Sequence, residues 1–85
     1  MAYRLIADRE YDFGQYSTIT EARRRAYLLH KRHVNLFDRF AIKNGSYTEG
    51  YILSYKDGTE IVYRSMTGKR AKYHLNKDGT LGRRL

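Results

Sequence analysis

The sequence predicts an α+β fold: an N-terminal strand and one helix, then a four-stranded antiparallel meander with the helix packed on one face. Three observations predict this class. The chain of 85 residues has a length that fits one domain. A helix start signal precedes apolar residues at helical spacing. Glycine-containing dipeptides then separate four strand-like runs. We expect one domain over residues 1–76 and a basic turn and tail over residues 77–85.

The first strand is predicted over residues 3–8, because Tyr3, Leu5 and Ala7 alternate with the charged residues Arg4 and Asp8. Residues 9–17 stay open between two interpretations. One is an irregular turn, and the other is a turn followed by a short strand over residues 13–17.

The helix is predicted to start at a capping box over residues 18–21. Thr18 can accept from the backbone N–H of Glu21, while the Glu21 side chain reaches back to the start of the helix. The helix should run to about residue 33. Its inner face would consist of Ala22, Ala26 and Leu29, extended by His33 if the helix reaches that far. Small alanines on this face let the helix lie close to a sheet.

Four strand-like runs follow the helix, over residues 37–43, 46–56, 59–66 and 69–76. The connections between them are Asn44-Gly45, Asp57-Gly58 and Thr67-Gly68. Asn-Gly and Asp-Gly favour the type I′ turn, which needs positive φ at both central residues. If each connection is a two-residue loop, the pairing register follows, and so does the face on which each side chain lies.

Two-residue loops predict a core face under the helix and a second, open face. The core face would carry Phe40, Ile42, Tyr47, Tyr51, Leu53, Tyr55, Val62, Ala71, Tyr73 and Leu75, with Asp38, Glu49, Glu60 and Arg64. The open face would carry Phe37, Arg39, Ala41, Lys43, Thr48, Gly50, Ile52, Ser54, Ile61, Tyr63, Arg70, Lys72 and His74. On this prediction the open face has no acidic residue, an apolar centre and a basic surround.

The chain is basic, with 17 Lys and Arg against 9 Asp and Glu and a net charge of +8. The excess lies in two stretches, residues 18–33 and residues 64–85. This charge favours polyanionic or acidic partners. A solvated helix face and a solvated tail would account for it equally well.

An open sheet face with central aromatic rings and a basic rim is one way in which small domains hold single-stranded nucleic acid. The predicted nucleic-acid-binding residues are Arg39, Lys43, Tyr63, Arg70, Lys72 and His74. The plain alternatives are a solvent-facing sheet with scattered exposed apolar groups and a face covered by the N-terminal segment or a second subunit. The alternative function is a protein-interaction or inhibitor module that binds an acidic protein.

The residue patterns argue against catalysis, a cofactor and a metal site. There is no cysteine, no glycine-rich phosphate loop and no serine elbow. His74 close to Glu60 or Tyr63 would be too weak a coincidence to indicate acid–base chemistry. His30 and His33 have helical spacing, but the basic residues between them repel a cation, so we expect no metal.

No apolar run approaches the roughly 20 residues of a membrane span, and the N-terminus lacks the apolar stretch of a signal peptide. The absence of cysteine fits a reducing compartment. We therefore expect a cytoplasmic protein without a membrane partner. A small basic domain of this kind would suit an accessory protein of a bacterium or a phage.

Overall fold

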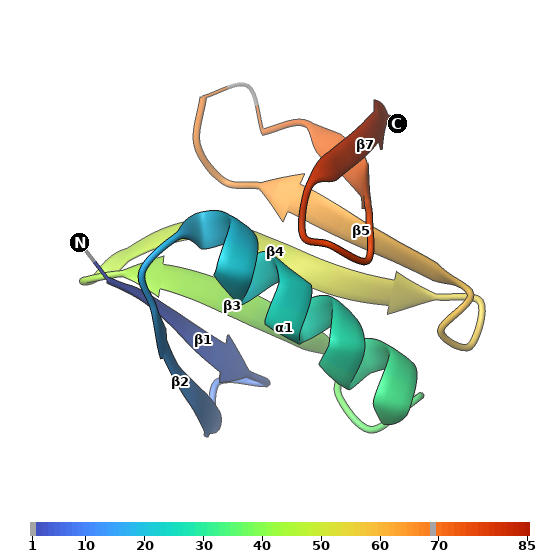
Figure 1. Ribbon diagram of the computed structural model, residues 1–85, viewed down its shortest axis with the longest axis horizontal. Helices are drawn as coiled ribbons and strands as arrows, with labels where there is room; N and C mark the ends of the chain where they lie inside the picture. Colours follow the sequence, from blue (N-terminus) through green and yellow to red (C-terminus); the bar gives the residue numbers. More distant parts are fainter. Residues whose placement is uncertain (1, 69) are drawn as a thin grey trace.

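A computed structural model describes residues 2–68 and 70–85 as one helix packed on a seven-stranded antiparallel sheet (Figure 1). The elements are β1 (Tyr3–Ala7), β2 (Tyr11–Tyr16), α1 (Ile19–Arg32), β3 (Arg39–Asn44), β4 (Tyr47–Tyr55), β5 (Glu60–Ser65), β6 (Lys72–Leu75) and β7 (Leu81–Arg84). The strand order is β2-β1-β3-β4-β5-β6-β7. The mixed α+β class is confirmed, while a four-stranded meander understates the sheet.

Two strands lie where the sequence suggested less order. β2 forms in the segment that stayed open, and it pairs with β1 through Ala7 opposite Tyr11. The residues expected to be a loose tail include β7, which pairs with β6. The chain end is also tied down, because the Leu85 N–H donates to the Lys72 carbonyl at 2.9 Å.

The helix starts where the capping box predicted. Thr18 is the N-cap, and its hydroxyl accepts from the Glu21 N–H at 3.1 Å. The Glu21 carboxylate accepts from the Ser17 hydroxyl at 3.2 Å. α1 ends at its C-cap, His33, which lies exposed. The helical residue that extends the buried stripe is instead His30, one turn after Ala26.

β2 and β3 lie on either side of β1, so the segment that connects them must cross β1. α1 makes this crossing and lies across one face of the sheet (Figure 1). The core under the helix contains Leu5, Ala7, Phe40, Ile42, Ile52, Ile61, Tyr63 and Leu75 from the strands and Ala22, Ala26 and Leu29 from α1. Both ends of α1 also meet hairpin turns. Lys31 Nζ donates to the Gly58 carbonyl at 2.6 Å, and a side chain at Gly79 would overlap the Thr20 carbonyl.

The predicted faces are wrong for β4 and β5 because a β-bulge interrupts the β3–β4 ladder. Lys43 pairs with Thr48, but Ile42, the residue before Lys43 in β3, pairs with Gly50. The extra residue in β4 is Glu49, and it moves the rest of that strand to the opposite face. Residues predicted to be in the core, Tyr51, Leu53, Tyr55, Glu60, Val62 and Arg64, therefore lie on the face away from the helix. Conversely, Gly50, Ile52, Ser54, Ile61 and Tyr63 face the helix.

The β5–β6 connection restores the predicted faces for β6. The expected two-residue loop at Thr67-Gly68 would pair Arg64 with Ala71, whereas the structure pairs Arg64 with Lys72. This shift of one residue reverses the effect of the bulge. The β4–β5 hairpin, in contrast, has the predicted register, with Tyr55 opposite Glu60.

Candidate functional site

The sequence-predicted site is brought together only in part. Arg39, Lys43, Lys72 and His74 lie on the sheet face away from the helix, which we call the open face. Arg70 is exposed but belongs to the β5–β6 connection, where its φ is 53°. Tyr63 is misplaced by the prediction: it is 3% exposed beneath α1, with the Arg23 guanidinium 5.0 Å from its ring centre. Burial raises the pKa of the Tyr63 hydroxyl, and the Arg23 charge opposes this rise.

The open face presents Tyr51 at its centre in place of Tyr63. Tyr51 is half-buried and lies opposite Ala41 on β3 and opposite Arg64 on β5. Arg64 in turn lies opposite Lys72 on β6. These four residues form one row across the sheet. Because neighbouring strands are about 4.8 Å apart, the row places an aromatic ring and then two cations within roughly 10 Å.

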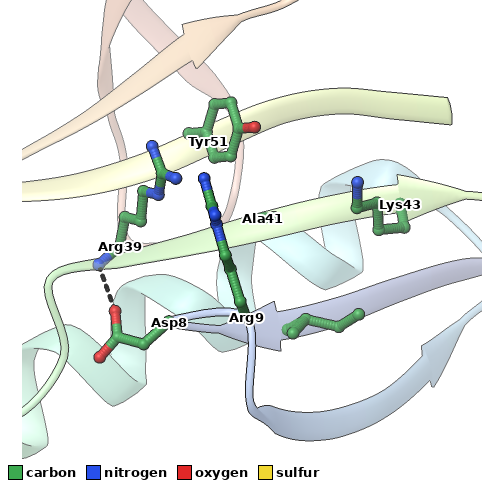
Figure 2. Close-up of a pocket in the computed structure, with 7 residues that line it drawn as sticks. Asp8, Arg9, Arg39, Ala41, Lys43 and Tyr51 are labelled. Atoms are coloured by element: carbon green, nitrogen blue, oxygen red, sulfur yellow. Dashed lines mark hydrogen bonds between the residues drawn. The ribbon is translucent and has the colours of Figure 1, made fainter.

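A pocket of about 350 Å³ opens beside Tyr51 on the same face (Figure 2). We call it the Arg9 pocket; its lining residues are Ile6, Asp8, Arg9, Arg39, Ala41, Lys43 and Tyr51. Figure 2 shows the guanidinium groups of Arg9 and Arg39 directed toward Tyr51. The Arg39 guanidinium carbon lies 4.6 Å from the centre of the Tyr51 ring, a cation–π contact.

The one acidic residue in the Arg9 pocket is directed toward the backbone. The Asp8 carboxylate accepts from the N–H of Arg39 at 3.1 Å (Figure 2) and from the N–H of Asp38 at 3.0 Å. Lys43 Nζ donates to the Thr48 hydroxyl at 2.5 Å. Among residues 2–68 and 70–85, the side-chain cations of Arg9, Arg39 and Lys43 have no carboxylate within ion-pair distance. Their charge is therefore available to an anion.

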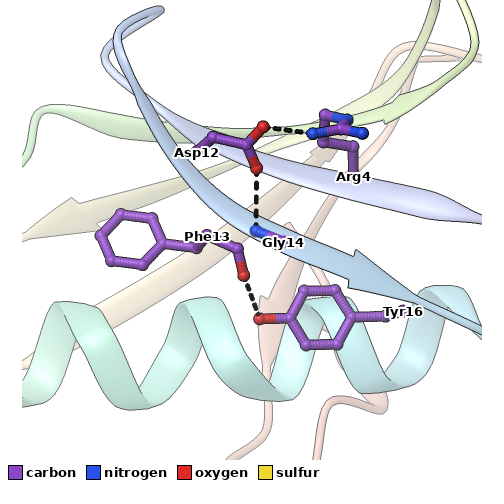
Figure 3. Close-up of polar contacts among 5 residues, drawn as sticks. All are labelled: Arg4, Asp12, Phe13, Gly14 and Tyr16. Carbon is purple, nitrogen blue, oxygen red and sulfur yellow. Dashed lines mark hydrogen bonds and ion pairs between the residues drawn. The ribbon is translucent and has the colours of Figure 1, made fainter.

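Acidic side chains compensate other cations on this side of the molecule. Asp12 forms an ion pair with Arg4 and accepts from the Gly14 N–H at 2.8 Å (Figure 3). The Gly14 hydrogen bond, followed by the Arg4 contact, holds the pKa of Asp12 below its ordinary value. Figure 3 also shows the Tyr16 hydroxyl donating to the Phe13 carbonyl, a hydrogen bond between two residues of β2.

His74 belongs to a different part of the open face from the Arg9 pocket. Its Nδ1 lies 3.7 Å from the carboxylate of Glu60. The same carboxylate forms an ion pair with Lys56 Nζ at 3.5 Å. The Nε2 of His74 lies 3.4 Å from the Arg83 guanidinium. The expectation of an open face without acidic residues is therefore wrong, because Glu60 faces the same side and neutralises the end that carries His74.

Sequence analysis placed Tyr51 and Arg64 of this face in the core, and it missed one further basic residue of the site, Arg9. Arg9 sits in the β1–β2 turn, where the Glu10 N–H donates to the Ala7 carbonyl at 3.0 Å. The φ values of Asp8 and Arg9 are 51° and 65°, in the left-handed region. Hairpin turns of this kind favour asparagine and glycine, so a turn built from Asp-Arg carries no recognisable signal in the sequence.

Within the described ranges, no group of three or more His, Cys, Asp or Glu residues could hold a metal ion. The described helix is neither long nor apolar enough to cross a membrane. Comparisons of the chain with models of protein families, with curated proteins and with solved structures found no match.

Proposed function

We propose that this chain binds single-stranded nucleic acid on the open face of its sheet. The observation that carries the proposal is the set of cations around Tyr51 that lack carboxylate partners. Phosphates would contact Arg9, Arg39 and Lys43 in the pocket and Arg64 and Lys72 along the row, while bases would stack at Tyr51.

The layout matches the two requirements of single-strand binding. Phosphate contacts need cations that are not already neutralised, and these supply most of the affinity. Base stacking needs a flat surface, which an aromatic ring or a guanidinium plane provides. Tyr51 and Arg39, already stacked on each other, present both kinds of plane on a face that α1 does not cover. The net charge of +8 supports the same class of partner.

The test is a fluorescence-anisotropy titration with short single-stranded DNA and RNA at several salt concentrations. Each phosphate contact releases condensed counterions, so log affinity should fall with log salt by about 0.7 per contact. The double substitution Arg64→Ala and Lys72→Ala should flatten this slope by roughly 1–1.5. Tyr51→Ala should weaken binding by about 1–3 kcal/mol at nearly constant slope, because stacking releases no counterion.

The matched control removes two charges from the other side of the molecule. Arg24 and Arg25 are exposed on α1, so replacing both with alanine should change the salt slope less than the change at Arg64 and Lys72. No binding to DNA or RNA at low salt would reject the proposal. Co-purification of an acidic protein in that case would favour an interaction or inhibitor module.

A further inference from the structure

We infer that the Arg9 pocket receives the terminal phosphate monoester of a bound strand, so that the protein prefers phosphorylated ends. This inference rests on the proposed single-strand binding and names the part of the ligand that the pocket takes.

The charge gathered in the pocket exceeds what an internal phosphate needs. A phosphodiester carries one negative charge, whereas a terminal monoester carries about 1.5 to 2 at pH 7 and offers three acceptor oxygens. Three cations, Arg9, Arg39 and Lys43, line this one pocket. Farther along the row, Arg64 and Lys72 supply one cation per strand, a spacing that suits successive diesters.

Acidic residues border the pocket on the side of the β1–β2 turn. Asp8 lines the pocket, Glu10 is exposed in the turn, and Asp38 is exposed just before β3. A nucleic-acid backbone that continued past the pocket in this direction would meet the exposed carboxylates of Glu10 and Asp38. In the opposite direction the row from Tyr51 to Lys72 is basic. The pocket therefore suits the end of a strand whose body runs toward β6.

The turn that carries Arg9 is held against β3 before any ligand binds. The Asp8 carboxylate accepts hydrogen bonds from the N–H groups of Asp38 and Arg39. Lys56 and Arg70 also have positive φ in their own turns, so this backbone conformation does not by itself distinguish Arg9. What distinguishes Arg9 is the pocket that it lines together with Arg39 and Lys43.

The experiment compares oligonucleotides of one sequence, about eight nucleotides long, with a 5′-phosphate, a 3′-phosphate or neither. Anisotropy titrations at fixed salt measure the affinity of the wild type for each. We expect a phosphate at one end to tighten binding by about tenfold, as a charge-assisted contact should.

Arg9→Gly should abolish that preference, because it should weaken binding of the phosphorylated strand about tenfold more than binding of the unphosphorylated strand. Because glycine accepts positive φ without strain, this variant should keep or slightly raise the melting temperature, which separates binding from folding. Arg64→Ala is the matched control. It should weaken all three oligonucleotides equally and keep the preference for the phosphorylated end.

The outcomes separate the inference from the function on which it rests. Equal affinity for phosphorylated and unphosphorylated strands would overturn the terminal-phosphate site and leave single-strand binding intact. A preference that survives Arg9→Gly would also overturn it. A complete absence of binding would overturn both proposals.

Discussion

The two faces of the sheet are built from alternate residues of the same strands, yet they have different chemistry. On the face under α1, Phe40, Ile42 and Ile52 are fully buried. On the open face, their sequence neighbours Arg39, Lys43 and Tyr51 line a solvent-exposed pocket. One residue of register therefore decides whether a β3 or β4 side chain belongs to the core or to the candidate site. Substitutions on the covered face should change stability, and those on the open face should change binding.

The largest expected effect contrasts Phe40 with Leu53. Phe40 is fully buried and contacts the His30 ring edge-on at 4.7 Å between centroids. Phe40→Ala should lower the free energy of unfolding by about 3–5 kcal/mol, because it leaves a cavity in the core. Leu53 is only half-buried on the open face. Leu53→Ala should therefore lower the free energy of unfolding by less than about 2 kcal/mol. Urea unfolding measures both.

Equal losses at Phe40 and Leu53 would contradict the observed faces. They would indicate that the open face is covered by other parts of the chain. Val62 is already buried on the open face, with 2% of its surface exposed, although α1 does not cover that face.

What the sequence could predict depended on local interactions. The start of α1 was predictable because the hydroxyl of Thr18 and the backbone of Glu21 are three residues apart. The β4–β5 register was predictable because a short turn joins the two strands. φ is positive at Asp57 and Gly58, the dipeptide predicted for that turn, and also at Lys56.

The bulge at Glu49 could not be predicted from local pattern. β4 contains apolar or aromatic residues on both faces, so either register would bury a plausible core. What distinguishes them is the tertiary contact at Gly50, which leaves space for the Tyr63 ring to cross β4. The sequence does carry a signal for β7, because residues 77–80 repeat the Lys-Asp-Gly-Thr of residues 56–59, which connect β4 to β5.

The second prediction tests the contact that distinguishes the two registers. A side chain at Gly50 would overlap the ring and hydroxyl of Tyr63. Gly50→Ala should therefore destabilise the protein by roughly 1–3 kcal/mol through overpacking. In a Tyr63→Leu background the same change should cost much less, since the long ring is gone. A double-mutant cycle by urea unfolding measures the coupling, and additive losses would show that the two residues are not in contact.

The third prediction concerns His30, which joins the helix to the covered face. Its Nε2 lies 3.0 Å from the Ile52 carbonyl. Burial lowers the pKa of His30, and this effect outweighs the hydrogen bond to Ile52 and the charge of Asp8. The unfolded chain therefore binds the proton more readily. The stability from the neutral ring is present above the unfolded pKa, about 6.5, and is lost as the pH falls below it.

For one proton the loss cannot exceed about 1.4 kcal/mol per pH unit. Urea unfolding between pH 7.5 and pH 5.5 measures it. His30→Gln keeps an N–H donor but does not titrate, so its stability should fall less over this range. Identical slopes for the variant and the wild type would assign the pH dependence to other groups.

The smallest effect is expected at the start of α1, the element that makes one face of the sheet covered. The Thr18 hydroxyl accepts the Glu21 N–H at 3.1 Å, one of the donors that the first turn leaves without a helical partner. Thr18→Ala should cost about 1 kcal/mol. Thr20, already inside the helix, accepts only a long contact of 3.4 Å from the Arg23 guanidinium, so Thr20→Ala should cost less. Thermal unfolding of the two variants compares these changes. If Thr20 were the costlier residue, its contact with Arg23, rather than the cap, would be what holds this end of the helix over the sheet.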